Sequence, residues 1–226
     1  MHIQIRNLSK LYSPKKGLSP LNIEVSNGEM VAIVGHNGAG KSTLLKLLSS
    51  WILPDSGQVM IDGIDLTNRN LIVRKLGFVA EMPNLFENFS VEYNLRLHAN
   101  LFQIPPSRVE EILQEFNLLN FRKNKVRVLS KGLRQRVNMG RALISNPSVL
   151  LFDEPTSGLD FETTKDVYRM LSTLHKSGKT ILFTTHHLEE VKNLATRILV
   201  LHDGLLVFDG SPSQYFQSAA YKDLYI

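Results

Sequence analysis

The chain has 226 residues, enough for one large domain or a domain with a subdomain, and 43% of them are hydrophobic, so a full core can be buried. No run of 18 apolar residues occurs and cysteine is absent, which excludes a membrane-spanning helix, disulfides and thiolate metal sites. The net charge of +5 is mildly basic, the opening residues Met-His-Ile-Gln-Ile-Arg lack the apolar core of a signal peptide, and the absence of cysteine favours a cytoplasmic location.

The first part of the chain predicts strands that lead into a glycine-rich loop. Short strands are expected in the first thirty residues, with turns at 13–17 and 26–28. Met30 to Val34 is an apolar run typical of a buried strand, and the leucines between Ser42 and Ser50 have helical spacing. Between this strand and this helix, residues 35–43 read Gly-His-Asn-Gly-Ala-Gly-Lys-Ser-Thr.

Residues 35–43 have the composition of a phosphate-binding loop. Glycines let the backbone turn tightly and expose successive N–H groups to an anion, and the next helix would point its N-terminus at the phosphates. Lys41 can reach the β- and γ-phosphates of a nucleotide, and the Ser42 hydroxyl can ligate Mg²⁺. The residues predicted to bind the nucleotide here are Gly35, His36, Asn37, Gly38, Ala39, Gly40, Lys41, Ser42 and Thr43.

Residues 54–145 predict a hairpin, a strand and then helices. A turn at 54–57 precedes a hairpin of residues 58–61 and 64–66, and residues 76–80 form a short apolar strand. In the helical part, Ser90 is expected to cap a helix that runs toward Phe102, and Pro105 and Pro106 break this helix. Ser107 and Glu110 form a capping-box pattern at the start of a second helix, and Ser130 is expected to cap a third.

The last third alternates strands and helices. Strands are expected at 149–152 and 180–185, helices at 163–175 and 187–195, and a hairpin of residues 198–201 and 205–208 around Asp203-Gly204. Alternating strands and helices imply an α/β fold with a mostly parallel sheet, into which the helical middle is inserted as a subdomain.

The strand at 149–152 ends in two carboxylates. Asp153 can hold the Mg²⁺ that bridges nucleotide phosphates, and Glu154 is then placed to polarise an attacking water as a general base. About a hundred residues after a phosphate loop, an apolar-Asp-Glu run favours this function over a chance acidic strand end.

A basic block lies upstream of these carboxylates. Between Arg122 and Arg141 there are eight Lys or Arg residues and no Asp or Glu. Such a block suits nucleic acid, acidic lipid or the polyphosphate of a nucleotide, or it is a solvated helix face; aromatic residues are almost absent from it.

Several further motifs occur in the order found in ATP-binding cassette (ABC) ATPases. Leu-Ser-Lys-Gly-Leu-Arg-Gln-Arg at 129–136 resembles the family's signature motif, and Ser-Gly-Leu-Asp at 157–160 resembles its D-loop. His186 resembles its switch histidine, and Tyr12 resembles the aromatic residue that stacks on adenine. The resemblance covers essentially the whole chain.

This resemblance implies a RecA-like P-loop NTPase core with an antiparallel β subdomain, over residues 1–83 and 146–226, and a helical subdomain over about 84–145. It implies two cassettes, expected to be identical, that sandwich ATP head to tail, with Ser130 and Gly132 contacting the nucleotide held by the partner chain. His186 would then hold the γ-phosphate and the attacking water, and Ser42, Glu81 and Asp153 would hold Mg²⁺.

Three positions depart from the family pattern. Glu81 stands where the family has a Gln, Lys131 replaces the second glycine of the signature, and Leu133 replaces a common Gln. Lys131 must point away from the γ-phosphate or contact it as a cation. The first two departures are similar to exporter-type cassettes, including the ABC-2 group, and residues 125–130 are similar to the haem-exporter ATPase of bacterial cytochrome c maturation.

The expected function is that of an ATPase subunit, peripheral at the cytoplasmic face of the membrane, that energises a separate integral membrane transporter subunit. That subunit would dock near residues 81–89, where Phe86 and Phe89 line a groove or belong to the core. A soluble ABC ATPase acting on nucleic acid or ribosomes is the alternative, and no nucleic acid is expected, because the coiled-coil insertion and the second cassette of those classes are missing. A third interpretation, a P-loop small-molecule kinase, is disfavoured, because such an enzyme needs neither the signature nor the D-loop.

Overall fold

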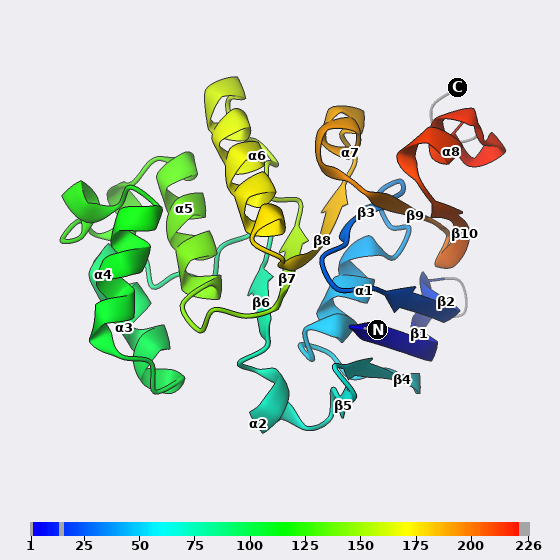
Figure 1. Cartoon of the computed structure of the whole chain (residues 1–226), viewed down its shortest axis with the longest axis horizontal. Coiled ribbons are helices and arrows are strands. Elements are labelled where there is room, and N and C mark those ends of the chain that lie inside the picture. The colour runs from blue at the N-terminus through cyan, green and yellow to red at the C-terminus, as the bar shows by residue number, and fades with distance from the viewer. Residues whose placement is uncertain (1, 14–15, 222–226) are drawn as a thin grey trace.

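A four-stranded antiparallel sheet forms one end of the molecule in the computed structural model, which describes residues 2–13 and 16–221 (Figure 1). Its strands, in the order β2-β1-β4-β5, are β1 (Ile3–Ser13), β2 (Lys16–Val25), β4 (Ser56–Ile61) and β5 (Ile64–Asp65). Ile3 pairs with Val25 on one side and with Ile61 on the other, and all three side chains are buried. This sheet covers one face of the central sheet.

The central sheet has six strands in the order β10-β9-β3-β8-β7-β6. They are β3 (Met30–Val34), β6 (Leu76–Val79), β7 (Val149–Asp153), β8 (Thr180–Thr185), β9 (Arg197–His202) and β10 (Leu205–Gly210). All neighbouring pairs are parallel except β9 with β10. Every residue of β3, β7 and β8 is buried, as expected for parallel strands covered on both faces.

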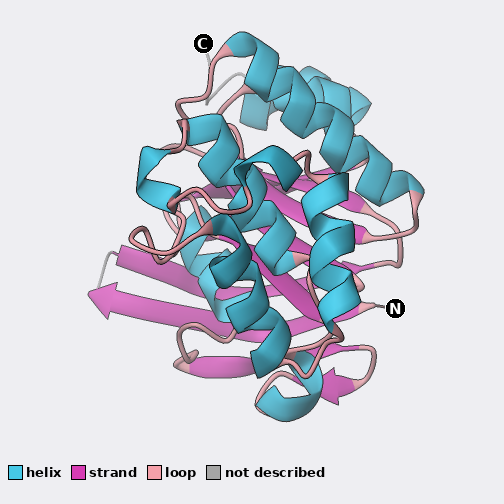
Figure 2. Cartoon of the chain, turned by 90° about the vertical axis from the view of Figure 1, so that its left-hand side faces the viewer, coloured by secondary structure: helices cyan, strands magenta, loops and turns pink. Residues whose placement is uncertain are grey.

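Helices flank the central sheet, and a group of them gathers at the end opposite the antiparallel sheet (Figure 1). The helices are α1 (Lys41–Leu48), α2 (Arg69–Ile72), α3 (Val91–Leu101), α4 (Pro106–Glu115), α5 (Lys131–Ala142), α6 (Phe161–Lys176), α7 (Leu188–Leu194) and α8 (Pro212–Gln217), with 3₁₀ turns at Leu119–Phe121 and Val126–Val128. Seen from that end, the helices lie in front of the strands (Figure 2). The predicted fold class, a mostly parallel sheet with an antiparallel sheet and inserted helices, is confirmed.

Two of the three predicted helix caps are present in the structure and one is not. The Ser90 and Ser130 hydroxyls accept hydrogen bonds from the N–H groups of Tyr93 and Leu133, so both predicted caps are confirmed. The predicted capping box at Ser107 is wrong, because α4 begins at Pro106, whose ring fixes a helical φ and needs no hydrogen-bond acceptor at the first position.

Other differences concern lengths and short elements. Helix α6 begins two residues earlier than predicted, because the Asp160 carboxylate accepts the Thr163 N–H at 2.9 Å and caps it. The first strands are longer than expected, and β1 continues through irregularities such as the one after Ile5. Helices α2 and α8 were not predicted. The expected turn at 13–17 includes residues 14 and 15, which lie outside the described residues.

The buried centre of the central sheet predicts a large stability effect. Replacing Phe152, which is fully buried in β7, by Ala should lower the free energy of unfolding by about 3–5 kcal/mol through lost apolar burial and a cavity. Urea denaturation monitored by circular dichroism measures this change. The control is Phe161→Ala on the surface of α6, where the ring is 69% exposed and the loss should stay within about 1 kcal/mol. Equal losses for the two variants would contradict the observed packing.

Candidate nucleotide-binding site

The glycine-rich loop joins the C-terminal end of β3 to the first residue of α1. Gly38 and Gly40 have φ values of 87° and 106°, which side-chain-bearing residues rarely adopt, and Gly40 is the N-cap of α1. No side chain caps the N-terminus of α1, so its first N–H groups remain available to an anion. The loop is thus built as an anion cradle.

Lys41 is held inside this cradle. Its Nζ donates to the carbonyl oxygens of Gly35 at 2.8 Å and His36 at 3.2 Å, and the side chain is 5% exposed. Burial lowers the pKa of the Lys41 ammonium, while the nearby carboxylates of Glu154 and Asp153 act in the opposite direction. An anionic phosphate beside Lys41 would further favour its charged form.

Thr184 of β8 contacts both acidic residues, and Asp153 in turn contacts Ser42 of the helix that follows the loop. Asp153 Oδ1 accepts from Ser42 Oγ at 3.0 Å and from Thr184 Oγ1 at 2.7 Å. The same Thr184 oxygen accepts the Glu154 backbone N–H at 2.9 Å. Glu154 has a φ of 46°, a left-handed conformation that is uncommon outside glycine and that functional sites often contain. His186 Nδ1 lies 3.1 Å from Glu154 Oε2.

A cavity of about 400 Å³ opens over these groups. It is lined by Tyr12, Lys16, Gly17, Asn37, Gly38, Gly40, Lys41, Ser42, Thr43, Glu81, Glu154 and His186. Tyr12 is 55% exposed at its wall. Two predicted loop residues have side chains elsewhere: Ala39 is buried, and His36 faces Asp203 with Nε2 at 3.3 Å from Oδ1.

The signature residues lie apart from this cavity. Among the described residues, neither Ser130 nor Gly132 lines it. Gly132 faces α6 so closely that a Cβ there would come within 2.6 Å of Thr163 Cγ2. The Lys131 ammonium lies over Gly158 of the same chain, at 2.2 Å from where a Cβ would stand, and Lys131 therefore points toward its own D-loop.

Half of the eight basic residues of this block have partners within the fold. Arg122 pairs with Glu92 and Glu110, and Arg136 pairs with Asp166. Two more of its arginines, Arg134 and Arg141, donate to backbone carbonyl oxygens. These contacts favour the interpretation of the block as structural rather than as a nucleic-acid interface.

The segment before α3 presents an aromatic cluster to solvent. Phe86 and Phe89 are 52% and 46% exposed, and Phe89 stacks on Tyr93 with ring centroids 4.3 Å apart. Of the two interpretations that the sequence left open for these phenylalanines, the core is therefore excluded.

Thr184 and two side chains of α5 contact the candidate site in ways that the sequence did not reveal. Gln135 Nε2 donates to the Pro155 carbonyl at 2.9 Å, and Asn138 Nδ2 donates to the Ala80 carbonyl at 3.2 Å. They link the signature helix to the residues that follow Glu154 and precede Glu81. Only the position of Gln135 inside the signature could have pointed to this link.

The fold and the cavity together define a P-loop nucleotide-binding protein. Residues 18–157 match the family described as "ABC transporter". The chain is 37% identical over 221 residues to a Nod factor export ATP-binding protein I of Cupriavidus metallidurans, covering 96% of this chain and 73% of that protein. It is 30% identical to the ABC transporter ATP-binding protein NatA of Bacillus subtilis, covering 98% and 94%.

A solved structure agrees with these relatives. It is a dimeric ATP-binding cassette in a post-hydrolysis state bound to ADP and Pi, with a TM-score of 0.84, 30% identity, and coverage of 92% of this chain and 98% of that one. The chain therefore belongs to the ABC transporter family and is an ATPase subunit of that family. Among the residues that the structure describes, no helix has the length and apolar character needed to cross a bilayer.

A buried carboxyl group lies behind the site. Glu190 of α7 is 1% exposed and accepts a hydrogen bond from the Thr156 hydroxyl. Burial raises the pKa of Glu190 to about 7, and the Glu154 carboxylate adds to this effect, whereas a hydrogen bond with Thr185 and the charge of His186 oppose it. The unfolded chain loses this proton at the ordinary pKa of a glutamate while the folded chain keeps it up to about pH 7, so Glu190 lowers the folding stability as the pH rises through this interval.

Glu190→Gln should change the pH dependence of stability. Gln keeps the shape of the protonated carboxyl, so the two proteins should be about equally stable at about pH 4, below the ordinary pKa of a glutamate. At pH 8 the variant should be more stable by up to about 3 kcal/mol, because the folded wild type must bury a charged carboxylate there and the variant does not. Urea denaturation at several pH values measures the difference, and parallel pH curves would show that Glu190 does not titrate as described.

Proposed function

We propose that the cavity over the phosphate loop is one half of an ATP-hydrolysing site, and that a second cassette completes it. The loop N–H groups and Lys41 would bind the triphosphate, and Tyr12 at the cavity wall would stack on the adenine ring. The observation that supports this most strongly is that Lys41, Ser42, Glu154 and His186 line one open cavity, and that Asp153 accepts a hydrogen bond from Ser42 beside it.

The oxygen ligands present fit a magnesium ion. Ser42 Oγ and Asp153 Oδ1 are 3.0 Å apart, and Glu81 lines the same cavity, so hydroxyl and carboxylate oxygens of the kind that Mg²⁺ prefers lie together. Bound Mg²⁺ would supply positive charge to the nucleotide phosphates. Thr184 would keep Asp153 oriented by its 2.7 Å hydrogen bond.

Glu154 is proposed as the general base. It would accept a proton from the water whose oxygen attacks the γ-phosphorus, as the bond from that phosphorus to the bridging oxygen of ADP breaks. The side chain is 16% exposed and therefore retains access to the cavity, and its backbone is held by Thr184. His186, at 3.1 Å from the carboxylate, would orient Glu154 and donate a hydrogen bond toward the γ-phosphate.

Ser130 and Gly132 are proposed to act on the nucleotide of a second, identical chain. Ser130 caps α5, so the N-terminus of this helix carries a positive dipole end beside a hydroxyl group that suits a γ-phosphate. Since neither residue lines the cavity of its own chain, contact in trans accounts for both.

The wider assignment is a transport ATPase, peripheral at the cytoplasmic face of a membrane and docked on an integral membrane subunit. The exposed cluster of Phe86, Phe89 and Tyr93 suits such a partner, and it lies in the proposed helical subdomain, residues 84–145, beside a core and β subdomain of residues 1–83 and 146–226. Glu81 and Lys131 support an exporter-type cassette, and the haem-exporter type remains a prediction. Nucleic acid is not proposed as a partner.

Glu154→Gln tests the proposed base. The amide cannot accept the proton, so ATP hydrolysis should fall by about 10²–10⁴-fold while ATP still binds, and the ATP-bound dimer should accumulate. Phosphate release and light scattering after gel filtration measure the two effects. The control Glu24→Gln makes the same chemical change on an exposed strand position and should leave turnover unchanged. Turnover of Glu154→Gln within threefold of wild type would remove Glu154 from this role.

A further inference from the structure

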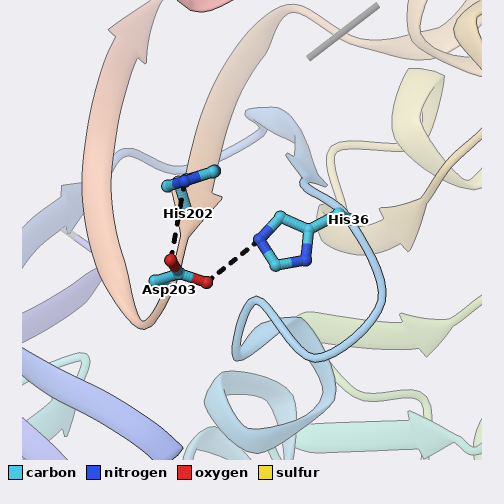
Figure 3. A group of neighbouring side chains, drawn as sticks. All are labelled: His36, His202 and Asp203. Atoms are coloured by element: carbon cyan, nitrogen blue, oxygen red, sulfur yellow. Dashed lines mark ion pairs between the residues drawn. The ribbon is translucent and has the colours of Figure 1, made fainter. Parts of the chain in front are cut away.

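Three metal-ligating side chains meet on the outer side of the phosphate loop. His36 belongs to that loop, and His202 and Asp203 lie at the turn between β9 and β10 (Figure 3). Their side chains are 41%, 53% and 71% exposed, so solvent ions reach them freely. None of the three lines the nucleotide cavity, so the cluster is separate from the proposed Mg²⁺ ligands.

The fold holds these residues in place through the backbone. Asp203 and Gly204 have φ values of 46° and 78°, as a tight two-residue hairpin turn requires. The Gly204 N–H donates to the Ala39 carbonyl at 3.1 Å, which fastens the turn to the phosphate loop. The approach of His202 and Asp203 to His36 is therefore set by the main chain and not only by mobile side chains.

The hydrogen bonding of His36 leaves one nitrogen directed at the cluster. Its Nδ1 is 2.8 Å from the Asn37 carbonyl oxygen, which can only accept, so Nδ1 carries the proton. The Nε2 atom then faces Asp203 Oδ1 at 3.3 Å. With the proton on Nδ1, the lone pair of Nε2 points toward the carboxylate oxygen and is free to ligate a metal ion there.

His202 supplies a second imidazole to the cluster. Its Nε2 lies 3.6 Å from Asp203 Oδ2, and its ring meets that of His36 edge-on with centroids 5.0 Å apart. One divalent ion serves all three ligands at once, and a histidine that donates Nδ1–H to a carbonyl oxygen is already oriented to ligate a metal through Nε2.

We propose that His36, His202 and Asp203 form a binding site for a transition-metal ion of the zinc class, which links the phosphate loop to the β9–β10 turn. The possible ligand atoms all lie within 4.8 Å of one another. Ligands of a tetrahedral zinc ion at about 2.0 Å are about 3.3 Å apart. His36 Nε2 lies at this spacing, 3.3 Å, from Asp203 Oδ1, and His202 Nε2 lies 3.6 Å from the other carboxylate oxygen, Oδ2.

The donor types select the metal. Two imidazole nitrogens and one carboxylate oxygen suit Zn²⁺, Co²⁺ or Ni²⁺, whereas Mg²⁺ prefers oxygen ligands alone. Three protein ligands leave a fourth position to water, so the site stays open on its solvent side. A bound ion would add a second link between the turn and the loop, beside the Gly204–Ala39 hydrogen bond.

Zinc titration of the full chain tests this site. The protein is freed of affinity tag, nucleotide and metal by cleavage and chelation, and Zn²⁺ binding is measured by calorimetry. Wild type should bind one Zn²⁺ per chain, and the thermal midpoint should rise with zinc, because binding to the folded state alone stabilises it. His202→Ala and Asp203→Asn should each weaken binding by about tenfold or more.

One control variant and the choice of the Asp203 substitution make the result decisive. His187→Ala removes an imidazole beside His186 and should leave zinc affinity unchanged, and Asp203→Asn keeps the turn because Asn tolerates a positive φ. Absence of stoichiometric binding in wild type would reduce the cluster to ion pairs and overturn the proposal. Equal zinc affinity in wild type and in Asp203→Asn and His202→Ala would place the metal elsewhere on the chain and overturn it as well.

Discussion

The parallel pairing of β3, β8 and β7 is the constraint on which the rest of the site depends. Val34 pairs with Thr185 and Asp153 pairs with Thr184, so the phosphate loop, Glu154 and His186 all begin within two residues of one sheet edge. These strands are buried on both faces, and a slip of one residue would turn every side chain to the opposite face. Core packing therefore sets the register, and the register sets the geometry of the chemistry.

Features that the sequence predicted well are those that local pattern determines. The loop at 35–43 lies between a buried strand and a helix, and Asp153 and Glu154 end an apolar run; both patterns are complete within about ten residues. The serine caps at 90 and 130 are local for the same reason. Helices α2 and α8 were missed because four and six residues show too little periodicity to be recognised.

Features that depend on tertiary contacts were out of reach. The direction of the His36 side chain depends on a hairpin more than 160 residues away in the chain, and no loop pattern encodes it. The double role of Thr184 appears only when β7 and β8 are paired. The sequence left open whether the Lys131 side chain points away from the γ-phosphate or toward it. Its position over Gly158 depends on how α5 lies against the D-loop, which is a tertiary contact.

The site is costly to the fold, and in the proposed assembly a second chain completes it. A left-handed conformation such as that of Glu154 costs about 1–3 kcal/mol, and burial of an ionisable Glu190 behind it adds to that cost. The buried core of the central sheet offsets these terms. Among the described residues, neither Ser130 nor Gly132 lines the open nucleotide cavity, and Ser130 caps the N-terminus of α5. The proposed head-to-tail arrangement of two chains would bring these two surfaces together.

Complementation between two inactive variants tests this central claim most directly. Lys41→Ala removes the phosphate contact of a chain and Ser130→Arg blocks its signature, so each protein alone should hydrolyse ATP very slowly. In a mixed dimer, one of the two composite sites contains an intact loop and an intact signature. An equimolar mixture should therefore recover up to about a quarter of wild-type ATPase activity, since half of the dimers are mixed and each has one working site. Activity that stays at the sum of the separate variants would mean that each chain completes its own site, and would contradict the account.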